Sequence, residues 1–173
     1  MDIGPKPPKL NQWTIAIIWI VLLIATTFIF NGVLKDINNP NQQLTVSINN
    51  NGEKQIVLQR NRYGHYVVTG KINGSDVTFL LDTGATLVAI PEHIASKLNL
   101  SKGAAFKTET ANGLSQSYRT RLESVAIGDI VMTNVLGSIS TGMEFDEILL
   151  GMSFLKHLNL NQQGKTLIIS VPE

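Results

Sequence analysis

Cysteine is absent from the sequence, which excludes disulfide bonds, thiol catalysis and cysteine-ligated metal sites and leaves the cellular compartment undecided. Charged residues are also few: they make up 16% of the chain, and the formal net charge is +1. A nucleic-acid-binding domain normally carries a strongly basic surface that matches the phosphate backbone. We therefore expect no nucleic-acid partner.

Metal-binding and phosphate-binding motifs are missing as well. The three histidines, His65, His93 and His157, are scattered and lack a metal-ligand spacing such as His-Glu-x-x-His. Neither a glycine-rich phosphate loop nor a Gly-x-Ser-x-Gly nucleophile elbow occurs. The sequence therefore predicts no metal ion and no other cofactor.

One long stretch carries no charge at all. From Trp13 to Phe30 every residue is apolar or small. A run of about 18 such residues is long enough to cross the hydrocarbon core of a lipid bilayer, so residues 13–30 are predicted to be a transmembrane helix. A cleaved signal peptide is the competing interpretation. The apolar core is long for such a peptide and no clear Ala-x-Ala site follows it, which favours a retained anchor.

The charges on either side of this span differ slightly. Lys6 and Lys9 precede it, whereas Lys35 is followed at once by Asp36. Because positive charge is preferentially retained on the cytoplasmic side of a membrane, the balance favours a single-pass protein with a cytoplasmic N-terminus. The main domain would then lie on the far side of the membrane.

Composition divides the chain into four segments. Residues 1–12 are predicted to be a proline-containing tail, and residues 13–30 the membrane span. Residues 31–43 are rich in Asn and Gln and are predicted to be a linker. Residues 44–173 are predicted to be the folded domain, which is long enough to enclose one hydrophobic core.

The folded segment alternates short apolar runs with turn residues. The expected strands cover residues 44–48, 55–58, 66–72, 76–81, 86–90, 106–110, 115–118, 122–127, 130–135 and 166–171, and the expected helices cover residues 91–98 and 151–158. Many short strands, closely spaced turn signals and only two short helices are typical of an all-β, barrel-like domain.

The tripeptide Asp82-Thr83-Gly84 lies between two of these apolar runs. It places one carboxylate on a tight turn at the end of a buried strand. An ionised carboxylate there is costly unless it is hydrogen-bonded or shares its site with a partner, so the position suggests chemistry. An ordinary turn is the alternative, because Asp and Gly favour turns for local reasons.

Leu80 to Thr86, Leu-Leu-Asp-Thr-Gly-Ala-Thr, resembles the active-site signature of aspartic peptidases in its short, retropepsin-like form. A hydrophobic pair followed by glycine, at residues 148–151, comes in the order and at about the spacing of that family. Residues 64–66, 72–74 and 150–155 are similar to segments of bacterial, membrane-anchored members. The resemblance implies a single-lobe acid-protease barrel preceded by a transmembrane helix, in the inner membrane with the protease domain periplasmic or otherwise extracytoplasmic.

The same resemblance implies an activity and a site. The activity is aspartic endopeptidase, in which two carboxylates activate one water molecule. The expected catalytic residue is Asp82, and the expected active-site turn comprises Thr83, Gly84 and Ala85, with the Thr83 hydroxyl bonding across a dimer. The expected flap, which closes over an extended polypeptide substrate, comprises Ala111, Asn112, Gly113 and Leu114. Because the chain carries one Asp-Thr-Gly, the second carboxylate is expected from a second copy, so activity would need a homodimer.

Two positions depart from the retroviral pattern. The flap tip contains only Gly113, and Met152 occupies a position where retroviral enzymes often carry an arginine that helps to hold the dimer. A different class of function also remains open: the same fold acting as a non-catalytic module that binds peptides or dimerises at the membrane. Fold alone does not establish activity.

Overall fold

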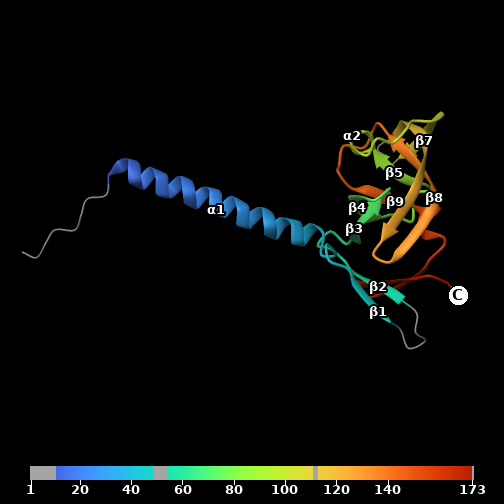
Figure 1. Cartoon of the computed structure of the whole chain (residues 1–173), viewed down its shortest axis with the longest axis horizontal. Coiled ribbons are helices and arrows are strands. Elements are labelled where there is room, and N and C mark those ends of the chain that lie inside the picture. The colour runs from blue at the N-terminus through green and yellow to red at the C-terminus, as the bar shows by residue number, and fades with distance from the viewer. Residues whose placement is uncertain (1–10, 49–53, 111–112, 173) are drawn as a thin grey trace, which may run out of the picture. The chain divides into compact units, whose positions relative to one another are not determined.

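The computed structural model describes residues 11–48, 54–110 and 113–172 (Figure 1). It is mostly β, with 46% of residues in strands and 24% in helices. The chain divides into two compact units, one ending at Lys35 and the other beginning at Asp36.

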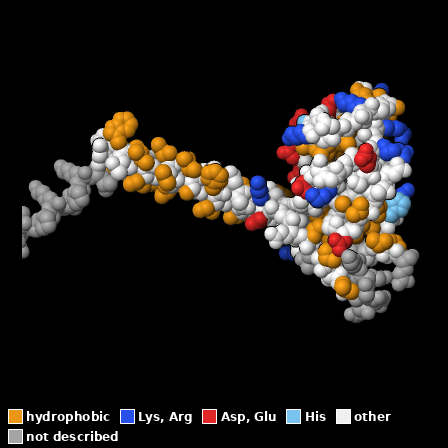
Figure 2. Space-filling view, in the orientation of Figure 1, with side chains coloured by type: hydrophobic (Ala, Val, Ile, Leu, Met, Phe, Trp, Pro, Cys, Tyr) orange, Lys and Arg blue, Asp and Glu red, His pale blue; other side chains and the backbone are white. Residues whose placement is uncertain are grey.

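The described part of the first unit consists almost entirely of a single long helix, α1 (Gln12–Asn38), whose last three residues belong to the second unit. Its 27 residues span about 40 Å at 1.5 Å per residue, more than the hydrocarbon core of a bilayer. No residue of α1 is buried, and hydrophobic side chains cover it in the space-filling view (Figure 2). The hydroxyls of Thr26 and Thr27 donate to the carbonyls of Leu22 and Leu23 at 2.7 and 2.8 Å. In the described part of the chain, α1 is the one helix long and apolar enough to cross a membrane.

The helix continues for eight residues beyond Phe30, through much of the segment expected to be a linker. Val33, Leu34 and Ile37 extend its apolar sequence, and Lys35 lies in the last turn, where a cation interacts favourably with the helix dipole. Residues 39–44, which follow, are not helical.

The second unit contains eleven strands and two short helices among its described residues. They are β1 (Thr45–Ile48), β2 (Lys54–Gln59), β3 (Val67–Ile72), β4 (Ser75–Leu81), β5 (Val88–Pro91), α2 (Glu92–Lys97), β6 (Ala105–Thr110), β7 (Gly113–Ile127), β8 (Ile130–Ser140), β9 (Ile148–Leu150), α3 (Met152–Leu155), β10 (Asn159–Gln163) and β11 (Thr166–Ser170).

Two sheets organise these strands. The larger has the order β3-β4-β9-β5-β8-β7-β6, and an additional pairing of β3 with β7 bends it toward a barrel. The smaller has the order β1-β2-β11-β10. Side chains from both sheets form one hydrophobic core, which includes Phe79, Ile139, Phe154 and Ile169, none of them exposed to solvent. The all-β, barrel-like fold with short helices predicted from the sequence is confirmed.

Several elements differ from the predicted ones in length. β7 is one strand of 15 residues where two short strands were expected, because alternation continues through Arg119 and Arg121 without a turn residue. Helix α3 has four residues instead of eight. Strand β10 was not predicted, because its sequence, Asn-Leu-Asn-Gln-Gln, lacks a regular apolar alternation. All five residues are exposed, and pairing with β11 determines their conformation.

A buried polar side chain precedes the first strand. Asn41 is only 3% exposed. Its amide nitrogen donates to the carbonyls of Gln59 and Val67 at 2.9 and 2.7 Å, and its side-chain oxygen accepts from the Gln59 amide at 2.7 Å. Asn41 therefore joins β3 to the end of β2, although it lies in the segment that composition marks as a linker.

Candidate active site

Asp82 follows β4 directly and begins the turn that leads to β5. The hairpin of β3 and β4 holds this strand in place, and its Asn73-Gly74 turn has positive φ at both residues, 50° and 82°. The Asp82 amide donates to the carbonyl of Leu150 at 3.2 Å, and its side chain is half-buried. This hydrogen bond fixes the backbone of Asp82 to the neighbouring strand β9.

The turn also binds its own carboxylate. The Gly84 amide donates to Oδ1 of Asp82 at 2.8 Å, and the Ala85 amide donates to the Asp82 carbonyl at 3.3 Å. A backbone N–H directed at the carboxylate limits its rotation. Thr83 is exposed on the same turn.

Strand β9 lies between the two strands that flank the turn. Its Leu149 is opposite Leu80 in a parallel pairing with β4 and opposite Ala89 in an antiparallel pairing with β5. Directly after β9, a side chain at Gly151 would place its Cβ 2.5 Å from the Ala85 carbonyl oxygen, closer than real contacts allow. The hydrophobic pair and glycine singled out in the sequence therefore pack against the turn, and only glycine fits there.

Ser153 is a supporting residue that sequence reasoning missed. Its hydroxyl donates to the Leu136 carbonyl at 2.7 Å and accepts from the Val88 amide at 3.0 Å, while its own amide donates to the Thr86 carbonyl at 2.9 Å. It therefore connects α3 to β5, β8 and the turn. A serine after a glycine landmark gives no sequence signal of such a role.

A cavity of about 780 Å³ opens beside the turn. It is lined by Asp82 and residues 84–87 of the turn, Ala89 and Leu149 behind it, residues 106–109 of β6, Ser117 and Arg119 of β7, Ser138 and Ser140 of β8, and Gly142, Met143 and Phe145 of the following loop. Of the expected turn residues, Asp82, Gly84 and Ala85 border the cavity and Thr83 does not. The residues from β6, β7, β8 and the loop were not predicted.

The predicted flap corresponds to the hairpin of β6 and β7. Thr110 pairs with Gly113. The two residues between them in the sequence, Ala111 and Asn112, lie outside the described residues. Gly113 has a φ of 105°, and Leu114 is 74% exposed; neither lines the cavity. The hairpin lines the cavity further from its tip, through residues such as Phe106 of β6 and Ser117 of β7.

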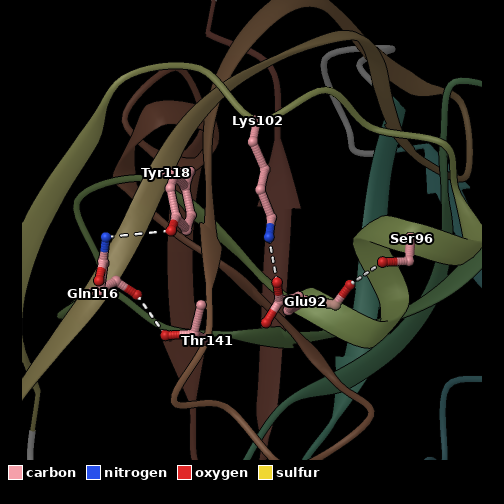
Figure 3. Close-up of polar contacts among 6 residues, drawn as sticks. All are labelled: Glu92, Ser96, Lys102, Gln116, Tyr118 and Thr141. Atoms are coloured by element: carbon pink, nitrogen blue, oxygen red, sulfur yellow. Dashed lines mark hydrogen bonds and ion pairs between the residues drawn. The ribbon is translucent and has the colours of Figure 1, made fainter.

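A polar network supports the base of this hairpin (Figure 3). Lys102 pairs with the Glu92 carboxylate of α2 and lies 4.8 Å from the centroid of the Tyr118 ring on β7. The side-chain amide of Gln116 donates to the Tyr118 hydroxyl at 3.2 Å, and the Thr141 hydroxyl donates to the backbone carbonyl of Gln116 at 3.0 Å. The hydrogen bond with Glu92 raises the pKa of Lys102. The network ties the hairpin to α2 and to the loop after β8.

No three acidic, histidine or cysteine side chains in the described ranges come together in a way that would hold a metal ion. Two other aspartates do not line the cavity: Oδ1 of Asp146 lies 2.8 Å from Nε2 of His93, within hydrogen-bond distance, and Asp129 lies in the turn between β7 and β8. Among the described residues that line the cavity, the acidic ones are Asp82 and Glu109.

Comparisons with known proteins agree with this geometry. A family model described as "gag-polyprotein putative aspartyl protease" matches residues 68–157, which include the turn, the hairpin and β9. A crystal structure of a retropepsin-like aspartic protease from Rickettsia conorii is similar, with a TM-score of 0.56 and 32% identity over 66% of this chain and 97% of that one.

Two curated relatives have uncharacterized functions. The "uncharacterized protein in cobV 5'region" of Sinorhizobium is 28% identical over 84% of this chain, which covers 66% of that protein. An uncharacterized protein of Rickettsia prowazekii is 31% identical over 66% of this chain, which covers 50% of that protein. The chain thus spans about half to two thirds of these relatives' lengths. The family match, together with the Asp82 turn and the strand that packs behind it, shows that the chain belongs to the retropepsin-like aspartic protease family.

Proposed function

We propose that this chain is a membrane-anchored aspartic endopeptidase whose catalytic group is Asp82. The observation that carries the proposal is the Asp82 turn itself: a half-buried carboxylate, bound by the Gly84 amide, at the edge of a cavity of about 780 Å³. An acidic side chain held by the backbone next to a large cavity suits general acid–base chemistry.

The proposed reaction uses two Asp82 carboxyl groups and one water molecule. The ionised carboxylate takes a proton from the water, which attacks the peptide carbonyl, and the protonated partner donates its proton to the carbonyl oxygen. Aspartic proteases are the standard case of such a pair, in which like charges at close range keep one carboxyl group protonated. When the tetrahedral intermediate collapses, the carboxyl group that took the water's proton donates it to the leaving amine, and the other carboxylate takes a proton back from the intermediate's hydroxyl. No covalent bond to the enzyme forms.

The second Asp82 is proposed to come from a second copy of the chain. Only one Asp-Thr-Gly occurs in the sequence, and retropepsin-like folds are typically dimeric. Glu109 is a poor substitute, because alternation along β6 places it on the opposite face of the hairpin from Phe106 and Thr108. Thr83, exposed beside Asp82, is available to bond across such a dimer.

Residues 13–30 are proposed to anchor the chain in the cytoplasmic membrane, within the longer helix α1. The proposed orientation, with a cytoplasmic tail at residues 1–12 and a periplasmic or otherwise extracytoplasmic protease domain, rests on Lys6 and Lys9 before the span. A shared bilayer would raise the local concentration of monomers and favour the dimer.

The substrate is proposed to be an extended polypeptide. It would bind as an added strand beneath the hairpin of β6 and β7, with backbone hydrogen bonds providing affinity and alternate side chains filling pockets. Residues 111–114 would close over it and exclude water.

Cleavage of a diverse peptide library by the full chain in detergent micelles tests the proposal. Wild type is compared with Asp82→Asn, and with Asp76→Asn as a matched control, because Asp76 is an exposed aspartate of β4 that pairs with Lys71. We expect wild type and Asp76→Asn to cleave and Asp82→Asn to be inactive. Cleavage that persists in Asp82→Asn would refute the mechanism. Peptide binding without cleavage by a folded, dimeric wild type would favour the non-catalytic module.

A further inference from the structure

One wall of the cavity contains small residues and ends at an arginine. Ala89 of β5 is opposite Ser138 of β8, and Ser138 is opposite Arg119 of β7. Residues opposite one another on neighbouring strands present their side chains on the same face. The side chains of Ala89 and Ser138 are short, so they leave open the space that runs from the Asp82 turn toward Arg119.

Arg119 is held by an aromatic ring and not by a carboxylate. Its guanidinium carbon lies 5.3 Å from the centroid of the Phe106 ring, and the residue as a whole is exposed to solvent at the edge of the cavity. Within the described residues its side chain makes no ion pair. Stacking on an aromatic face fixes the plane of a guanidinium and leaves its N–H edges available, and these edges match a carboxylate in a bidentate pair.

Apart from Asp82 and Arg119, the charged residues that line the cavity are Lys107 and Glu109, and neither side chain lies on the same face of the hairpin as Arg119. Lys107 and Glu109 alternate on β6 with Phe106 and Thr108, so their side chains project from the opposite face of the hairpin. Thr108, on the same face as Phe106, has a buried hydroxyl without a hydrogen-bond partner among the described residues. A buried hydroxyl without a partner is costly.

We propose that Arg119 is a specificity-determining residue that binds an acidic side chain of the peptide substrate. The inference extends the proposed function by naming a substrate class: peptides that carry Asp or Glu at a position away from the cleaved bond. Four strand spacings of about 4.8 Å separate β4 from β7, and an extended peptide advances about 3.3 Å per residue. This separation is about 19 Å along the sheet, so the acidic residue is expected several positions from the cleaved bond and at most about six.

Matched peptides test the proposal on the full chain in detergent. A series places Glu at one position at a time, and its partner series places Gln there; the ratio of kcat/KM for Glu over Gln measures the preference. We expect a ratio of about tenfold for wild type, the size of one partly exposed charge-assisted pair. In Arg119→Gln the ratio should fall to about one. In Arg119→Glu it should fall below one, and a peptide with Lys at the same position should be cleaved better than the Gln peptide.

Arg121→Gln is the control. Arg121 lies two residues further along β7 on the same face, but it bonds to the Asn134 side chain and does not line the cavity. Its Glu/Gln ratio should equal that of wild type. A ratio near one in wild type at every position, or an unchanged preference in Arg119→Gln and Arg119→Glu, would overturn the proposal and leave Arg119 a packing partner of Phe106.

Binding separates this inference from the proposed function. The same Glu and Gln peptides, fluorescently labelled, are titrated into Asp82→Asn and into Asp82→Asn combined with Arg119→Gln. A Glu preference that only the double variant loses supports the role of Arg119 even if wild type cleaves nothing, which would refute only the peptidase. Equal affinity for both peptides in Asp82→Asn overturns the role of Arg119, whatever the cleavage result.

Discussion

The amide nitrogen of Gly84 lies 2.8 Å from Oδ1 of Asp82 and donates a hydrogen bond to it. The same two residues are close in another respect, since a Cβ at position 84 would lie 3.1 Å from Oδ1. The turn therefore holds the carboxylate from one side with almost no free space. The orientation of Asp82 depends on the residue two positions later.

Replacing Gly84 with alanine tests this dependence. The added methyl group must displace the carboxylate by a few tenths of an ångström, and displacement of a reacting group lowers the rate even where the fold survives. We expect kcat/KM to fall about tenfold or more in Gly84→Ala, with a melting temperature within a few degrees of wild type. Gly74→Ser, in an open hairpin turn away from the cavity, is the control for a general glycine effect, and it should lower stability but not kcat/KM of the folded fraction. Unchanged kinetics in Gly84→Ala would show that the contact does not orient Asp82.

Ser153 is predicted to stabilise the frame behind the turn. Ser153→Ala removes the partner of the Leu136 carbonyl and of the Val88 amide, and a partly buried group left without a partner costs about 1–3 kcal/mol. Denaturant unfolding measures this loss. Ser96→Ala is the matched control: its hydroxyl donates to the Glu92 carbonyl on the exposed face of α2, so we expect a change below about 0.5 kcal/mol. Equal effects of the two substitutions would contradict the structural role of Ser153.

Asn41 is predicted to be part of the folded domain. Asn41→Ala leaves the carbonyls of Gln59 and Val67 and the Gln59 amide without their partner, so we expect a loss of about 2–3 kcal/mol in the free energy of unfolding. Gln42→Ala alters the exposed neighbour and should change it little. An unchanged free energy of unfolding in Asn41→Ala would mean that the folded domain begins at β1, as composition alone suggests.

The pH dependence of cleavage follows from the proposed pair of Asp82 carboxyl groups. Because one of the two must stay protonated, the rate should be highest on the acidic side of neutral and fall as the pH rises. The Lys102–Glu92 pair does not cause this fall: the pKa of Lys102 is raised, so its contribution is complete below the usual lysine value and is lost only as the pH rises through the raised pKa. Circular dichroism across the range monitors folding. A rate that stays constant into strongly alkaline solution would contradict the proposed pair.

The sequence predicts those features that depend on local patterns. Asp82 and Gly151 were identifiable because each follows an apolar strand in the order of a known family, and Asn73-Gly74 because that dipeptide favours a tight hairpin turn. Ser153 and Asn41 were not, because their roles arise from contacts with strands distant in the chain.

The residues of the cavity wall were likewise only partly predictable from the sequence. Arg119 lies in a strand whose residues alternate, which predicts a side chain on one face but not the ring it stacks on or the cavity it faces. The register between β7, β8 and β5 supplies that information, and register depends on tertiary pairing. The sequence therefore predicted the position of the Asp82 turn at the end of a strand, but not the residues from β6, β7 and β8 that line the cavity beside it.

Mixing subunits tests most directly whether two copies of Asp82 form one active site. Wild type and Asp82→Asn chains are combined in equal amounts in detergent, allowed to exchange, and assayed at fixed total wild-type concentration against a parallel mixture with Asp76→Asn. If each site needs both carboxylates, random pairing leaves about half of the wild-type chains in wild-type dimers, so activity should fall to about half. A tenfold excess of Asp82→Asn should suppress it to about one tenth, while Asp76→Asn should not lower it. Activity that is insensitive to added Asp82→Asn would show that a single chain is sufficient and would contradict the account.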